Sequence, residues 1–156
     1  MDNRPPQTLC IRPALDADAA AIAQLLEQFG YPTSTEQCLN RLRRMNADTF
    51  HTLVAIETSS DRCEELAGFI GLLRLQVYTE CADIGWVLAL AVGQRHRRKG
   101  IGTALLNSAE SYFRRHGIEQ MHLHSAKDNL AAHLFYQANG FSDVALRFQK
   151  RIGASS

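Results

Sequence analysis

The chain has 156 residues, a formal net charge of +1 from 17 basic and 16 acidic side chains, and 46% apolar residues. These values are typical of one globular domain with one hydrophobic core. They exclude a generally basic nucleic-acid-binding protein, so any strongly positive site must be local. The longest uncharged apolar stretch, residues 84–92, is about half of the roughly 20 residues that a membrane-spanning helix needs.

Two further features of the sequence bear on its compartment and on metals. The N-terminal residues MDNRPPQTL lack the apolar core of a secretion signal, so we expect a cytoplasmic protein that is not bound to a membrane. The four cysteines form no C-x-x-C pair, so we expect reduced thiols and no metal site.

In the N-terminal half, we expect a loose tail, a strand, two helices and a second strand. Residues 1–8 are polar and contain two prolines, which is typical of a flexible tail. Residues 9–12 are typical of a short strand. Residues 16–29 and 33–45 carry apolar side chains at helical spacing, and residues 52–57 are typical of a buried strand.

In the C-terminal half, two apolar runs at residues 66–77 and 82–92 are rich in strand-forming residues. Their short connection predicts an antiparallel hairpin. Residues 102–116 show helical spacing and end at a glycine. The remaining expected elements are a strand at residues 121–124, a helix at 129–138 and a final strand at 144–152. This order predicts one α/β domain over residues 9–152, with a mixed sheet.

The stretch QRHRRKGIGTALL, residues 94–106, lies between an expected strand and an expected helix. Glycine lacks a Cβ atom, so the backbone N–H groups near Gly100 and Gly102 can approach an anion closely. The N-terminus of the following helix adds free N–H groups and the positive end of the helix dipole. Together with the basic side chains, these features predict a site for phosphate oxygens, most simply a pyrophosphate.

Two common phosphate-binding patterns do not fit this stretch. A Walker loop has its lysine after a glycine, whereas Lys99 precedes Gly100. The dinucleotide fingerprint would need a glycine in place of Leu105. The pattern R-x-x-G-x-G does fit, with Arg97, Gly100 and Gly102. The alternative interpretation of these six residues is a solvated basic turn before an ordinary helix.

R-x-x-G-x-G is the signature of the GCN5-related N-acetyltransferases (GNAT), and the chain resembles this family in its order of elements as well. Three more features carry the resemblance: the small apolar triplet Leu90-Ala91-Val92 before the loop, the pair Phe135-Tyr136 on a later helix, and Gly140-Phe141 after it. The resemblance covers about residues 11–152. It implies a single-domain GNAT-like fold with a mixed central sheet of six to seven strands, flanked by about four helices.

The resemblance also implies acetyl-CoA as the co-substrate, and no metal. The implied binding residues are Leu90, Ala91, Val92, Arg97, Arg98, Lys99, Gly100, Ile101, Gly102, Thr103, Asn129 and Tyr136. The triplet Leu90-Ala91-Val92 would act through its main chain. Arg98 stands where the family often has glycine and could add a phosphate contact. Asn129 is equally well explained as the N-cap of its helix.

By the same resemblance, Tyr136 is the expected general acid, because a phenol can give its proton to the leaving thiolate. The alternative interpretation is an amphipathic core tyrosine. Glu80 and Asp83 are candidate general bases, although each is also explained as a solvated turn residue. His122, His124 and His133 are further candidates, with surface positions on a strand and a helix as the alternative.

The sequence therefore predicts an acetyl-CoA-dependent N-acetyltransferase that acetylates a primary amine by direct attack on the thioester. The alternative is a non-catalytic acyl-CoA-binding sensor or partner module, which would not need Tyr136. The acceptor is an amine on a small molecule or a protein, and residues 28–35 and 77–83 are expected to select it. We expect neither nucleic acid nor membrane as a partner. A dimer is common in the family, so the resemblance allows a homodimer.

Overall fold

The computed structural model describes residues 8–45, 48–59, 62–78 and 82–152. The chain divides into two compact units, Met1–Leu123 and His124–Ser156, which are described in turn. The first unit contains, in chain order, β1 (Thr8–Pro13), η1 (Asp16–Asp18), α1 (Ala19–Gln28), α2 (Thr35–Met45), β2 (Phe50–Thr58), β3 (Glu64–Leu75), β4 (Ile84–Val92), η2 (Gln94–His96), α3 (Ile101–Arg115) and β5 (Met121–Leu123). The second contains α4 (Leu130–Ala138).

The sheet has five strands in the order β1-β2-β3-β4-β5. The first four are antiparallel neighbours, and β5 runs parallel to β4, so the predicted mixed sheet is confirmed. The four α-helices in the described residues also agree with the prediction. The predicted six to seven strands are wrong.

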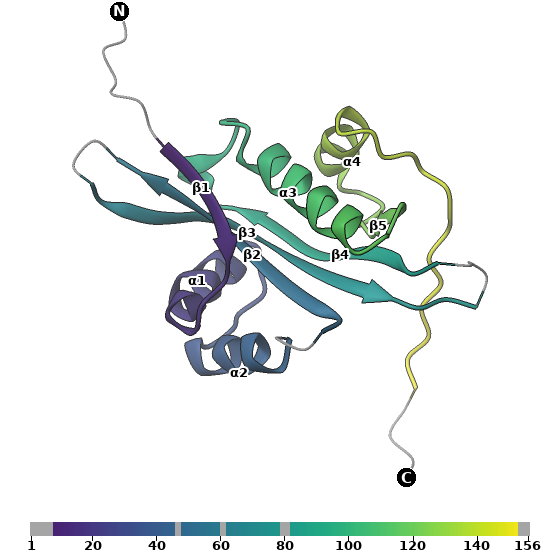
Figure 1. Cartoon of the computed structure of the whole chain (residues 1–156), viewed down its shortest axis with the longest axis horizontal. Coiled ribbons are helices and arrows are strands. Elements are labelled where there is room, and N and C mark those ends of the chain that lie inside the picture. Colours follow the sequence, from purple (N-terminus) through teal and green to yellow (C-terminus); the bar gives the residue numbers. More distant parts are fainter. Residues whose placement is uncertain (1–7, 46–47, 60–61, 79–81, 153–156) are drawn as a thin grey trace, which may run out of the picture. The chain divides into compact units, whose positions relative to one another are not determined.

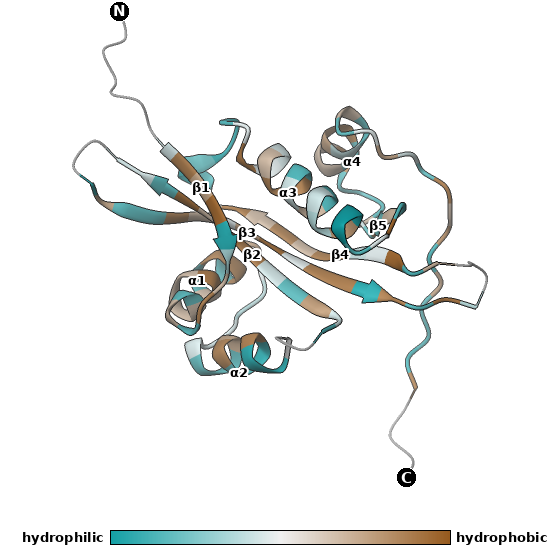
Figure 2. Ribbon diagram, in the orientation of Figure 1, coloured by the Kyte–Doolittle hydropathy of each residue, from teal (hydrophilic) through white to brown (hydrophobic). Residues whose placement is uncertain are grey.

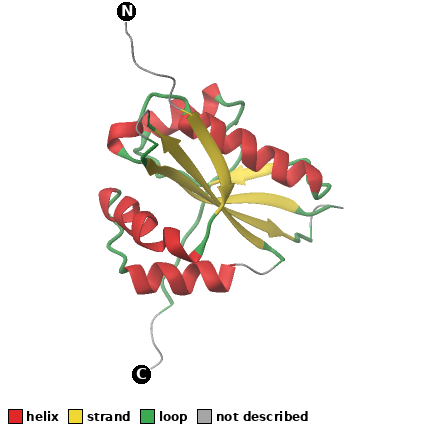
Figure 3. Cartoon of the chain, turned by 60° about the vertical axis from the view of Figure 1, so that its left-hand side comes forward, coloured by secondary structure: helices red, strands yellow, loops and turns green. Residues whose placement is uncertain are grey.

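Helices cover both faces of this sheet (Figures 1 and 3). On one face, α1 and α2 pack through residues such as Ile22 and Leu42 against Val54, Phe69 and Ala91 of the sheet. On the other face lies α3, whose buried stripe is Leu105, Leu106, Ala109, Tyr112 and Phe113. Figure 2 shows that β3 and β4 are hydrophobic along most of their length, so both faces of these strands need to be covered. This is the pattern of strands buried on two sides.

The start of α1 is fixed to β1 by an ion pair. Arg12 donates to both carboxylate oxygens of Asp18, at 2.8 and 2.9 Å, and the Leu15 N–H donates to the same carboxylate at 2.7 Å. Burial alone would raise the pKa of Asp18, but these hydrogen bonds outweigh it and the pKa is lowered. α2 begins with a reciprocal capping pair, in which Ser34 and Gln37 each accept from the other's backbone N–H.

A β-bulge in β4 changes which face its side chains occupy. Gly71 pairs with Ala89 and Leu72 pairs with Val87, so Leu88 is an extra residue without a partner on β3. Before the bulge, a Cβ atom on Gly85 would lie 2.6 Å from the Phe113 ring, on the α3 face. After it, Ala91 belongs to the core with α1 and α2. The bulge therefore exchanges the two faces of the strand.

In the second unit, Asn129 is the N-cap of α4, and its side chain accepts from the Ala132 N–H at 3.2 Å. The final strand predicted at residues 144–152 is wrong, because this segment has no strand assignment in the structure. Its alternating apolar side chains Val144, Leu146, Phe148 and Ile152 are 76–92% exposed. Alternation indicates a strand, but a strand also needs a partner for its backbone, and the described residues of the second unit contain no other strand.

Within the described residues, no helix combines the length and the hydropathy that crossing a membrane would require.

Candidate functional site

The loop between β4 and α3 ends at a glycine whose surroundings are open. Gly100 is the N-cap of α3 and has a φ of +79°, in the left-handed region that favours glycine. A Cβ atom built on it would meet nothing within 4 Å. The first helical bond runs from the Ala104 N–H to the Gly100 carbonyl at 2.9 Å. The N–H groups of Ile101, Gly102 and Thr103 precede this bond, so an anion in front of the helix can accept from them.

Arg97 holds the base of this loop. Its Nε donates to the carbonyl of Val92, the last residue of β4, at 3.3 Å. Its guanidinium carbon lies 5.1 Å from the centre of the Phe29 ring, at the C-terminal end of α1. This is a cation–π contact. The loop is therefore fixed to β4 and α1, and Arg97 has a structural role in addition to its positive charge.

Arg98 adopts a conformation that non-glycine residues rarely accept. Its φ is +60°, one of two positive values among non-glycine residues in the described chain. A left-handed conformation costs a residue with a Cβ atom about 1–2 kcal/mol relative to the right-handed one. This strain explains in physical terms why glycine suits the position.

Replacing Arg98 with glycine should therefore stabilise the folded chain. Strain relief of about 1–2 kcal/mol is partly offset by the larger entropy of glycine in the unfolded chain, about 0.4–1 kcal/mol. We expect a net gain of roughly 0.5–1 kcal/mol in the free energy of unfolding. Urea denaturation of Arg98→Gly, with Arg95→Gly as a control of equal charge loss, measures it. A loss of stability in Arg98→Gly equal to that in the control would show that the backbone at this position stores no strain.

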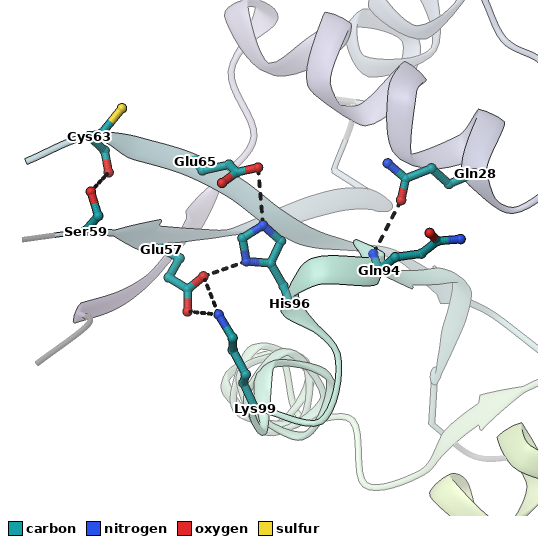
Figure 4. A network of polar contacts seen from close by, with 8 residues as sticks. All are labelled: Gln28, Glu57, Ser59, Cys63, Glu65, Gln94, His96 and Lys99. Atoms are coloured by element: carbon teal, nitrogen blue, oxygen red, sulfur yellow. Dashed lines mark hydrogen bonds and ion pairs between the residues drawn. The ribbon is translucent and has the colours of Figure 1, made fainter. Parts of the chain in front are cut away.

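Lys99 and His96 both contact the carboxylate of Glu57, at the end of β2 (Figure 4). The Lys99 ammonium lies 3.1 and 3.2 Å from the two carboxylate oxygens, and Nδ1 of His96 lies 2.5 Å from one of them. Burial alone would raise the pKa of Glu57, but the hydrogen bonds from Lys99 and His96 lower it below its usual value. Glu57 is thus a buried, ionised residue directly behind the loop.

Leu90, Ala91 and Val92 pair with Ile70, Phe69 and Gly68 of β3. On the opposite side of β4, the ladder with β5 joins only Gly85–Val87 to Met121–Leu123. In the described sheet, no strand pairs with the last residues of β4 on that side. The main-chain groups of this stretch that point to that side can therefore hydrogen-bond an extended ligand there, beside the loop, whereas the Val92 carbonyl already accepts from Arg97.

The candidate catalytic residues lie in different parts of the chain. Glu80 falls outside the described residues. Asp83 is half-buried and immediately precedes β4. Tyr136 is half-buried on α4, with its ring centre 5.3 Å from that of Phe135 and 5.7 Å from that of Phe141. Burial raises the pKa of the Tyr136 phenol above its usual value.

The contacts of the candidate histidines His122 and His133 hold their rings in place. His122 stacks on Trp86 with ring centres 5.6 Å apart, and its Nε2 lies 3.2 Å from the Gln120 side-chain oxygen. His133 Nε2 lies 2.9 Å from the Ala126 carbonyl. In the part of the chain that the structure covers, no three His, Cys, Asp or Glu side chains are grouped to hold a metal ion.

Sequence reasoning found the loop but missed Glu57, His96 and Phe29. Glu57 and His96 are 39 residues apart, and no local pattern links them. The one available signal was a glutamate at the end of an otherwise apolar strand, which is unusual when that strand is buried.

The glycine-rich, basic loop that leads from β4 into the open N-terminus of α3 is an arrangement suited to binding an anion. The model of the acetyltransferase (GNAT) family matches residues 19–141. The chain belongs to the GNAT acetyltransferase family.

Named relatives agree with this family. The chain is 36% identical over 64 residues to N-alpha-acetyltransferase 60 of Drosophila melanogaster, covering 39% of this chain and 23% of the relative. It is 26% identical over 104 residues to aminoglycoside N(6′)-acetyltransferase type 1 of Acinetobacter haemolyticus, covering 65% of each. It thus spans less than two thirds of the length of these curated relatives.

Among solved structures, aminoglycoside N-acetyltransferase AAC(6′)-Iy in complex with CoA superimposes with a TM-score of 0.77 at 16% identity, covering 95% of this chain and 98% of that one. At this level of identity the likeness shows the fold alone.

Proposed function

We propose that this chain is an acetyl-CoA-dependent N-acetyltransferase that acetylates a primary amine by direct attack on the thioester. The observation that carries the proposal is the open N-terminus of α3 at Gly100, reached from the end of β4 through a basic loop. A pyrophosphate there would accept from the N–H groups of Ile101, Gly102 and Thr103. Arg97, Arg98 and Lys99 would add positive charge.

The main chain of Leu90, Ala91 and Val92 would hold the pantetheine arm, because no strand in the described sheet pairs with the last residues of β4 on the side of β5. An N–H group in this stretch would also polarise the thioester carbonyl. Asn129, already the cap of α4, would add a hydrogen bond to the same arm. These roles need no side-chain chemistry from the triplet, which is consistent with the burial of Ala91.

The chemical step moves three protons. Asp83 or Glu80 would accept the first from the substrate ammonium, so that the neutral amine nitrogen forms a bond to the carbonyl carbon. The carbon–sulfur bond then breaks, the nitrogen releases its second proton to solvent as the amide forms, and the thiolate takes a proton from the Tyr136 phenol. The raised pKa of Tyr136 keeps the phenol protonated, and therefore able to donate, throughout the neutral range. Solvent restores its proton after the products leave.

The names of the relatives define which acceptors to test first. One is an aminoglycoside N-acetyltransferase and another an N-alpha-acetyltransferase. A screen of thiol release from acetyl-CoA should therefore include aminoglycosides, polyamines, single amino acids and peptides with free N-termini. We expect turnover with at least one of these amines. Binding of CoA without turnover across the panel, and without acetylation of proteins in a lysate, would favour the alternative of a non-catalytic acyl-CoA sensor.

Two properties of the whole protein belong to the same proposal. Cytoplasmic location is supported by the free cysteines Cys10, Cys38 and Cys63, which are typical of a reducing compartment. A homodimer is supported by the large exposed side chains Val144, Leu146, Phe148 and Ile152, since exposed apolar groups of this size often mark interfaces. Light scattering distinguishes a dimer from a monomer.

A further inference from the structure

Two glutamates face each other at the end of the β2–β3 hairpin, with a histidine between them (Figure 4). Glu57 and Glu65 are direct partners across the two strands. Like charges in this arrangement are unfavourable. The imidazole of His96 has Nδ1 2.5 Å from Glu57 and Nε2 3.3 Å from Glu65. The Glu65 side chain is 60% exposed and that of Glu57 only 10%, so Glu57 depends on its protein partners whereas Glu65 is solvated.

The partners of Glu57 stand on either side of two loop arginines. His96 comes directly before Arg97, and Lys99 directly after Arg98. A single buried carboxylate thus binds the loop at both ends of the arginine pair, and it does so across the left-handed backbone at Arg98. A strained conformation persists only where its surroundings hold it in place.

We propose that Glu57 is a positioning residue, which holds the loop of residues 96–100 in the conformation that presents the N-terminus of α3 to the pyrophosphate of CoA. This rests on the proposed function. Glu57 acts through His96 and Lys99 and does not touch the ligand. The role differs from that of the basic residues, because it comes from an acidic side chain next to an anion site.

The direction in which CoA affinity changes in Glu57→Gln separates a positioning role from a purely electrostatic effect of the Glu57 charge. Glu57 is negative and lies close to a site for phosphate, so its charge alone opposes anion binding. If only charge counted, Glu57→Gln would bind CoA more tightly. If Glu57 positions the loop, the same variant binds CoA more weakly, although it has gained positive net charge. Glu65→Gln is the matched control, because it removes the same charge from the opposite strand without breaking a contact to Lys99.

The experiment is calorimetric titration of wild type, Glu57→Gln and Glu65→Gln with CoA, and steady-state kinetics with acetyl-CoA and with S-acetylpantetheine, which lacks the pyrophosphate. We expect the dissociation constant for CoA to rise about tenfold in Glu57→Gln, the equivalent of one lost charge-assisted hydrogen bond. It should stay the same or fall in Glu65→Gln. The KM for acetyl-CoA should rise while kcat is kept, and kcat/KM for S-acetylpantetheine should not change.

A second pair of variants avoids removing the buried carboxylate. Asparagine at position 96 places an N–H donor near the position of Nδ1, whereas leucine does not. We expect His96→Asn to bind CoA more tightly than His96→Leu. Equal affinity in these two, or unchanged or tighter binding by Glu57→Gln, would overturn the positioning role. Absence of CoA binding by the wild type would instead overturn the proposed function, and this role with it.

Discussion

Gly100→Val should lose most of its affinity for acetyl-CoA while keeping its fold. A branched side chain at Gly100 would occupy the open space in front of α3, where we place the pyrophosphate. It would separate the phosphate oxygens from the helix N–H groups. Two lost charge-assisted hydrogen bonds, at about 1.5 kcal/mol or more each, correspond to a loss of roughly 100-fold in affinity. Calorimetric titration with acetyl-CoA measures it.

The chain offers a close control at the other end of α3. Gly117 has a φ of +72°, against +79° for Gly100, and a Cβ atom built on either would meet nothing within 4 Å. Valine therefore imposes a similar backbone strain at both positions, at least about 1–2 kcal/mol. We expect similar losses of stability in the two variants and a loss of affinity only in Gly100→Val. Equal affinities in the two folded variants would place the pyrophosphate elsewhere. If valine prevents folding, the alanine pair tests the same point.

Tyr136→Phe should reduce kcat by about 10²-fold or more and leave the affinity for acetyl-CoA almost unchanged. The substitution removes only the hydroxyl, so the ring contacts with Phe135 and Phe141 are kept. Steady-state thiol release with an amine found in the screen measures the rate. Tyr112→Phe is the control, since it removes a hydroxyl from the buried ring on α3 that stacks on His51. If Tyr136→Phe turns over at the wild-type rate, the hydroxyl of Tyr136 has a structural role and not a catalytic one.

The pH dependence of the wild type gives a second test of Tyr136. Because burial raises the pKa of the phenol above its ordinary value of 10.0, the donor keeps its proton until the solution is strongly alkaline. Proton donation by Tyr136 is therefore present below that pKa and is lost only as the pH rises through it. We expect no decline of kcat from this group below about pH 10. A decline at lower pH that disappears in Tyr136→Phe would contradict this.

Elements with a complete local pattern were predicted well from the sequence. The helix expected at residues 102–116 is α3, Ile101–Arg115, and the two apolar runs of the expected hairpin are β3 and β4. In each case the spacing of the apolar residues, the length of the segment and its flanking residues all predict the same kind of element. The final strand failed because alternation in residues 144–152 describes only one half of a pair. Whether a segment becomes a strand depends on a partner elsewhere in the chain.

The candidate site likewise has some features that the sequence predicts and others that it does not. The positions of Gly100 and Gly102 follow from a short motif and the helix behind it. The contact between Lys99 and Glu57 joins residues 42 apart. It depends on how the strands pair, which neither of the two local sequence segments predicts. The left-handed backbone at Arg98 was not predicted, because a residue with a Cβ atom rarely has a positive φ. The one signal for it was the glycine that the family often has at this position.

The bulge at Leu88 makes β4 tolerant of two kinds of genetic change at one position. Leu88 is 44% exposed, so exchanging its side chain should cost little. Deleting it would join Val87 directly to Ala89, and both would stay opposite Leu72 and Gly71, so Leu90, Ala91 and Val92 would keep their partners on β3 and their present faces. Their peptide groups, which we place along the pantetheine arm, would keep their directions as well. A codon altered or lost at this position would therefore spare the core and the cofactor groove, and its loss would remove only the local bend that the bulge gives the strand.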